Sequence, residues 1–172
     1  MKKALFLSYT ALICSSLFAG PIYSQRSSAV AESVFVKNGR YPESPVAEIS
    51  SKAIRSFNKE YKNVSNVNWF ISSAGLSVAH FTHNNVETFV YYSARGTYEF
   101  MVRNYKEEKL PIEVLRLLKS NYYGFDIYHI TEISRNNTIA YGVNLKYKNS
   151  WKTIKVLEGE IELITEYTEP QK

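Results

Sequence analysis

The chain carries one pattern twice, and this repetition restricts the possible folds more than any other feature of the sequence. Each copy predicts an amphipathic helix followed by four short strands. Apolar side chains recur at helical spacing between Val46 and Tyr61, and again between Val114 and Tyr122. Strand-like runs follow the first helix at about 66–71, 76–83, 86–93 and 97–104, and the second at about 126–133, 138–147, 151–157 and 160–167.

Start and stop signals bound both predicted helices. Ser44 is suited to cap the first helix and Pro45 to occupy its first position. The polar residues that begin at Asn63 end this helix. Pro111 begins the second helix, and Gly124 ends it.

The two copies also align residue by residue. Ile54, Phe57 and Tyr61 match Leu115, Leu118 and Tyr122 at an offset of 61, Ala79 and Phe81 match Val143 and Leu145 at 64, and Gly96 matches Gly159 at 63. A single copy of this length buries little apolar area, so two copies sharing one sheet make a more credible core. We therefore predict an α+β fold of two tandem helix-plus-four-stranded antiparallel units that share one sheet, with both helices on one face.

The N-terminus has the form of a secretory signal peptide. Lys2 and Lys3 precede an uncharged run of about 16 residues, which is shorter than the roughly 20 needed to span a bilayer. We predict a signal peptide at 1–24, with cleavage before Gln25, and a periplasmic or secreted protein. An uncleaved anchor is the alternative. A flexible tether at 25–43 then precedes one domain, made of a first unit at 44–105 and a second at 106–172.

Cysteine content and charge exclude several classes of protein. Cys14 is the only cysteine, so removal of the signal leaves no thiol and no disulfide. Ile13 and Ala11 do not match a lipoprotein signal, which makes lipidation of Cys14 the lesser alternative. The net charge of +5 falls by two when Lys2 and Lys3 are removed. The remaining charge is too small and too scattered to indicate a nucleic-acid partner.

Several short segments together resemble a known family. Residues 62–69 read KNVSNVNW, Leu110-Pro111 opens the second helix, residues 122–124 read YYG, and residues 141–145 read YGVNL. Their order and spacing resemble the PepSY-like, β-lactamase-inhibitor-protein-like (BLIP-like) periplasmic family. The resemblance covers about residues 44–168 and implies a tandem helix-plus-sheet fold with mostly unassigned function. Lys62-Asn63 replaces the family's usual proline, and Ser93 its usual aspartate.

The sequence predicts no catalytic or metal-binding residues and no cofactor. His80 and His83 are three positions apart on a predicted strand, so their side chains point to opposite faces. Asp126 is the only aspartate, and its spacing from His129 is also odd. The glutamates of the last hairpin alternate with other residues, as on a solvated strand face. We therefore expect a protein that is not an enzyme, and rank catalysis as the last of three hypotheses.

A binding surface is predicted from the alternation of side chains along the strands. Ala79 and Phe81 match Val143 and Leu145, and therefore face the helices. On the same logic Val90 and Tyr92, and then Tyr98, Phe100 and Val102, are expected in the core. The opposite, open face would carry an aromatic and methionine patch edged by charge, which is typical of protein interfaces. The candidate partner-binding residues are His80, Phe89, Tyr91, Met101 and Arg103. The alternative is that the parity is reversed, because a shift of one residue exchanges the two faces.

The function predicted from these features is that of an exported, non-catalytic binding protein. It would act as a protein–protein interaction or inhibitor module on an unidentified envelope or secreted protein, through the open sheet face. The alternative is an envelope sensor or carrier of a small apolar or peptide ligand, which requires a cavity between the sheet and the helices. Neither hypothesis includes a membrane span after signal cleavage.

Overall fold

A computed structural model describes residues 49–170, and the predicted signal peptide at 1–24 and tether at 25–43 lie outside them. We call residues 49–105 the first half and 106–170 the second half. The first half contains helix α2 (Ser51–Glu60) and strands β1 (Asn68–Ile71), β2 (Ser77–His83), β3 (Val86–Tyr92) and β4 (Tyr98–Tyr105). The second half contains the 3-10 helix η2 (Glu107–Lys109), helix α3 (Ile112–Asn121) and strands β5 (Asp126–Arg135), β6 (Thr138–Tyr147), β7 (Ser150–Leu157) and β8 (Glu160–Thr168).

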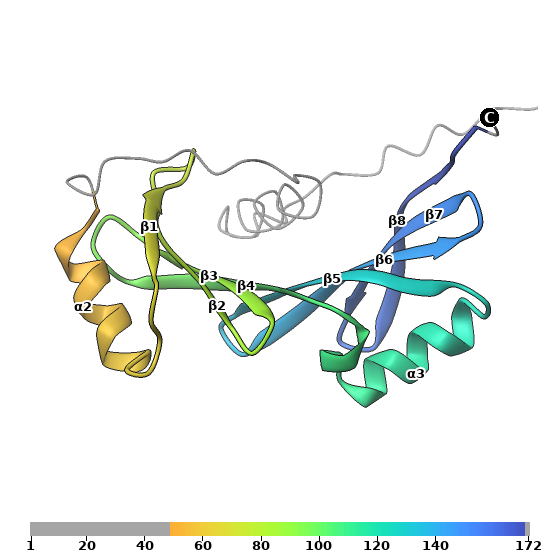
Figure 1. The fold of residues 1–172 in the computed structure, drawn as a ribbon, viewed down its shortest axis with the longest axis horizontal. Coiled ribbons are helices and arrows are strands. Elements are labelled where there is room, and N and C mark those ends of the chain that lie inside the picture. The colour runs from red at the N-terminus through yellow and green to blue at the C-terminus, as the bar shows by residue number, and fades with distance from the viewer. Residues whose placement is uncertain (1–48, 171–172) are drawn as a thin grey trace, which may run out of the picture.

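The eight strands form one antiparallel sheet in which every strand pairs with the next in sequence (Figure 1). This confirms the predicted α+β class and the positions of all eight strands, to within two residues at each end. Short turns join the strands within each half as hairpins, whereas η2 and α3 lie between β4 and β5. Asn84 and Asn85 have φ angles of 50° and 61°, and Asn136 and Asn137 have angles of 48° and 66°. Asparagine tolerates this left-handed conformation, which is why these pairs can form two-residue turns.

The start of the first helix differs from the prediction. Ser44 and Pro45 lie outside the described residues, but Ile49 and Ser50 are not helical. Ser50 is extended, with φ −60° and ψ 118°, and its N–H donates to Ser77 Oγ at 3.3 Å. A continuous helix from Pro45 to Glu60 is therefore wrong, because Ser50 leads into α2 as its N-terminal cap. The apolar spacing that predicted the helix holds only from Ala53 onward.

Two apolar clusters lie between the sheet and the helices. Ala53 and Phe57 of α2 pack against Ala79, Phe81 and Val90 in the first half. In the second half, Leu118 of α3 packs against a larger set from the sheet, which includes Ile127, Ile130, Tyr141, Val143, Leu145, Ile154 and Val156. Figure 1 shows α2 beside the first four strands and α3 beside the last four.

The register across the middle of the sheet places these two clusters on the same face. Val90 pairs with Met101, and Met101 pairs with Ser134 on β5. Paired residues share a face, and so do residues two apart on one strand. Ser134 therefore shares its face with Ile130, which belongs to the α3 cluster. A third apolar cluster occupies the other face, within the first half and its border with β5.

Candidate binding surface

The face of the sheet opposite the clusters that contain Ala53 and Leu118 is here called the helix-free face. In the first half its side chains form an apolar layer, which consists of Phe70, Val78, Phe89, Phe100, Val102 and Ile133. Phe89 is 1% exposed, so its ring is buried and not presented to solvent. The side chains of this layer therefore pack as a core does, and not as a solvated strand face.

Two of the predicted residues lie on this layer and are half-buried. The His80 ring stacks on Phe89, with centroids 4.4 Å apart and planes within 4°. Tyr91 stacks on Phe100, with centroids 4.2 Å apart. The structure thus brings together His80, Phe89 and Tyr91 on three neighbouring positions of β2 and β3. Aromatic pairs of this kind add to the energy of area burial and hold both rings in fixed orientations.

A row of polar side chains crosses the helix-free face beside the apolar layer. His80 Nε2 lies 3.1 Å from Glu87 Oε1, and the other oxygen of Glu87 accepts a hydrogen bond from Asn104 Nδ2 at 3.0 Å. Thr131 Oγ1 then donates to Asn104 Oδ1 at 3.0 Å. The row connects β2 to β5 and bounds the apolar layer with partnered polar groups.

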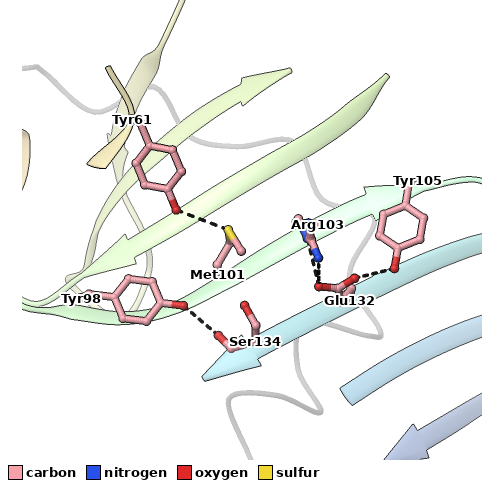
Figure 2. Close-up of polar contacts among 7 residues, drawn as sticks. All are labelled: Tyr61, Tyr98, Met101, Arg103, Tyr105, Glu132 and Ser134. Atoms are coloured by element: carbon pink, nitrogen blue, oxygen red, sulfur yellow. Dashed lines mark hydrogen bonds and ion pairs between the residues drawn. The ribbon is translucent and has the colours of Figure 1, made fainter. Parts of the chain in front are cut away.

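Met101 and Arg103 are on the opposite face, so their assignment to the same patch is wrong. Met101 pairs with Val90 and packs against the α2 cluster. Figure 2 shows the Tyr61 hydroxyl, just beyond α2, donating to Met101 Sδ, at 3.6 Å. The same figure shows Arg103 directed at Glu132 of β5.

An irregularity in the β3–β4 pairing explains the error. Tyr92 pairs with Tyr98, but its neighbour Tyr91 pairs with Phe100, so Glu99 is an extra residue. A β-bulge of this kind shifts the alternation by one residue. Tyr98 therefore contacts Tyr92 on the helix side, as predicted, whereas Phe100 and Val102 belong to the helix-free face.

The helix side of β4 and β5 contains a buried charge that the sequence interpretation missed. Glu132 is 3% exposed, and its carboxylate accepts hydrogen bonds from Arg103 Nε at 3.0 Å and from the Tyr105 hydroxyl at 2.6 Å (Figure 2). Burial, followed by the hydrogen bond to Glu132, raises the pKa of the Tyr105 phenol. The available signal was a glutamate two positions from Ile130, at a core-facing position of a strand. The hydrogen bonds of Glu132 to Arg103 and Tyr105 link β5 to β4, and thus the second half to the first.

Within residues 49–170 there is no group of three or more His, Cys, Asp or Glu side chains that could hold a metal ion. His129 lies on β5, and burial, followed by the charge of Lys106, lowers the pKa of its imidazole. No helix among the described residues has the length and apolar character needed to cross a membrane.

On the helix-free face of the second half, polar residues occupy the positions that match His80, Phe89 and Tyr91. Ala79 pairs with Val90 as Val143 pairs with Ile154, which fixes an offset of 64 between β2–β3 and β6–β7. At this offset the helix-facing residues Ala79, Phe81, Val90 and Tyr92 are matched by the apolar residues Val143, Leu145, Ile154 and Val156. On the helix-free face, His80, Phe89 and Tyr91 are matched by Asn144, Thr153 and Lys155. Thr153 Oγ1 donates to Asn144 Oδ1 at 3.1 Å, as expected on a solvated face.

Comparisons with known proteins show the fold. No protein family matches the sequence, and no curated protein sequence is similar to it. Several solved structures match. A BLIP-like protein from Bacteroides fragilis NCTC 9343 has a TM-score of 0.57 and 17% identity, over 76% of this chain and 89% of that chain. A DUF2874 family protein from Bacteroides ovatus ATCC 8483 has a TM-score of 0.58 and 16% identity, over 70% and 87%.

A candidate periplasmic protein from Bacteroides eggerthii DSM 20697 is also similar, with a TM-score of 0.57 and 12% identity, over 70% of this chain and 88% of that chain. These identities are low, so the similarities establish the fold and not the function. The chain has a BLIP-like α+β fold. The PepSY-like part of the resemblance stays a prediction, because none of these similar structures is described as PepSY-like.

Proposed function

We propose that this protein is an exported, non-catalytic binding module that engages an envelope or secreted protein through the helix-free face of its first half. The observation that carries the proposal is the apolar layer on that face. Apolar and aromatic side chains on a sheet face favour association with an apolar surface. In the second half, the positions that match His80, Phe89 and Tyr91 are polar.

The composition of the layer supports a protein partner. Aromatic side chains held in fixed stacks are enriched at protein interfaces, where they lose little conformational entropy on binding. The half-buried residues His80 and Tyr91 pack on this layer, and the His80 ring stacks on the buried Phe89. We expect a partner to contact these residues around an apolar centre, and to act by occupancy and without turnover. An inhibitor module is one form of this function.

We also propose that the two halves are copies of one unit, with both helices on one face. The repeated order of a helix and four strands, the constant offset between β2–β3 and β6–β7, and the shared register of the helix-side clusters support this. Export is supported by the signal-like N-terminus and by the similarity in fold to a candidate periplasmic protein.

A pull-down with matched variants tests the binding face. The immobilised protein is exposed to the envelope and secreted fractions of its host, beside the double variant His80→Ala/Tyr91→Ala. The control is Asn144→Ala/Lys155→Ala, which alters the matching positions of the second half. Circular dichroism establishes that all three proteins are folded. We expect a partner that the wild type and the control retain and the His80/Tyr91 variant loses. Retention by all three would rule out this face.

A further inference from the structure

A groove of about 360 Å³ lies in the second half, between α3 and the turns of the β5–β6 and β7–β8 hairpins. It is on the helix side of the sheet, and so it is separate from the helix-free face. Its wall is mostly apolar and is formed by Val114, Leu117, Ile139, Tyr141 and Val156. The volume is within the lower part of the range found for small-molecule sites.

The first half has no such opening at the matching turn, because the turn there touches the helix. Gly96, in the β3–β4 turn, is so close to α2 that an added Cβ would lie 2.5 Å from Lys52 Cβ. Gly159, its match in the β7–β8 turn, would place a Cβ with nothing within 4 Å. The second half therefore leaves open the space between turn and helix that the first half closes.

Two carboxylates give the groove a negative rim. Glu113 belongs to the first turn of α3, and Glu158 to the β7–β8 turn. Neither takes part in any ion pair found among residues 49–170. The other polar groups along the groove are uncharged, and come from Asn137 and Thr138. Among residues 49–170, no basic residue lines the groove.

We infer that this groove binds a small organic cation, a primary ammonium group on an apolar aliphatic or aromatic body. The apolar wall removes the body from water, and the two carboxylates attract the ammonium group at the rim. A carboxylate ligand would be repelled by Glu113 and Glu158, and a neutral ligand would gain only the apolar contact. The inference does not depend on the partner-binding face.

Titration with three probes of similar shape tests the charge preference. The ¹⁵N-labelled protein is titrated with 2-phenylethylammonium, 2-phenylethanol and 3-phenylpropionate, and amide shifts are followed by NMR. We expect the ammonium probe to shift the amides of Leu117, Ile139 and Gly159 and to bind roughly fivefold tighter than the alcohol, the effect of about one surface ion pair. Absence of shifts at these amides, or tighter binding of 3-phenylpropionate, would overturn the inference.

Three variants separate the charge from the shape of the groove. Glu113→Gln/Glu158→Gln should lower the affinity for 2-phenylethylammonium to that for the alcohol, while Glu108→Gln, an exposed carboxylate outside the groove, should leave it unchanged. Leu117→Trp should fill the groove and abolish binding of all the probes. If the double variant keeps the preference for the ammonium, or Leu117→Trp binds it as the wild type does, the groove is not the site.

Discussion

In the first half of the sheet, Phe89 and Tyr91 face away from α2, and at the matching positions of the second half the chain has Thr153 and Lys155. The helix-facing positions differ much less, because Ala79 and Val90 are matched by Val143 and Ile154. One backbone arrangement thus supports one apolar face in the second half and two in the first. The comparison teaches that the fold requires apolar residues on the helix side in both halves, whereas on the helix-free side the residues can be apolar or polar.

On the helix side the two halves differ at the turns beside the helices, and here it is the second half that has the additional feature. Gly96 closes against α2, whereas Gly159 borders the groove beside α3. Each half therefore has one feature that its counterpart lacks, an apolar layer in the first and an apolar groove in the second. Substitutions at matched positions can test each difference separately, because the partner position serves as the control.

The largest expected effect is at the apolar layer. Phe89→Ala should lower the free energy of unfolding by about 3–5 kcal/mol, as truncation of a buried phenylalanine does, because Phe89 is 1% exposed. Thr153→Ala, at the matching position, should cost only about 1 kcal/mol through loss of its hydrogen bond to Asn144. Urea unfolding monitored by fluorescence measures both. Equal losses would mean that the layer does not pack as a core in solution.

The next effect compares two buried tyrosines from the two helix-side clusters. Tyr105→Phe should cost about 1.5–3 kcal/mol, because the Tyr105 hydroxyl donates to the buried Glu132 carboxylate at 2.6 Å. The Tyr92 hydroxyl is buried and finds no hydrogen-bond partner among the described residues. Tyr92→Phe should therefore leave stability unchanged or raise it slightly. Thermal unfolding distinguishes the two, and a comparable loss in Tyr92→Phe would reveal a partner for that hydroxyl.

A smaller effect is expected at the two matched turns. Gly96 and Gly159 have φ angles of 79° and 84°, so alanine is strained at both positions. Only at Gly96 does the new Cβ also collide with the backbone of α2, 2.7 Å from Lys52 C. Gly96→Ala should therefore cost about 1–3 kcal/mol more than Gly159→Ala, the size of a local overpacking effect. Urea unfolding of the two variants checks this difference, and equal costs would mean that the turn does not press on α2.

Much of this fold could be predicted from the sequence, because its signals are local. Alternating apolar residues and asparagine-rich turns located all eight strands, and the offset between copies identified Ala79 and Phe81 as helix-facing. The faces predicted for the residues of β4 after Tyr98 were wrong, because the extra residue Glu99 shifts the pairing with β3. The sequence of β4 contains no signal of this shift. The faces of β2 were predicted correctly because its pairing with β3 is regular, and those of β4 were not because its pairing has a bulge.

The rest of the candidate site depends on contacts between distant segments. Glu132 is separated from Arg103 by 29 positions, and no spacing rule connects the two. The start of α2 was misplaced for a similar reason, because Ser50 is extended and its N–H donates a hydrogen bond to Ser77, at the start of β2. The positions of residues in an apolar pattern could be predicted, whereas those of polar residues that bond to a distant residue of the chain could not.

The smallest expected effect is a pH dependence of stability at His129, in the second half. His129 pairs with Asn144 as Asn68 pairs with His80, so Asn68 is its match in the first half. Burial, and then the charge of Lys106, lowers the pKa of His129 below its ordinary value of about 6.5. The unfolded chain therefore binds a proton at a higher pH than the folded protein does. Stability from this group is complete above about pH 6.5 and decreases as the pH falls toward the folded pKa.

The variant His129→Asn installs the residue of the matching position and removes the titration. We expect the wild type to lose more stability than His129→Asn when urea unfolding is repeated from pH 7 down to pH 5, with the difference confined to that window. Lys106→Gln should reduce the difference in part, because it removes the second cause of the shift and leaves the burial of the imidazole. Parallel pH profiles for the wild type and His129→Asn would show that His129 titrates alike in the folded and unfolded chain, and that the two halves do not differ in this respect.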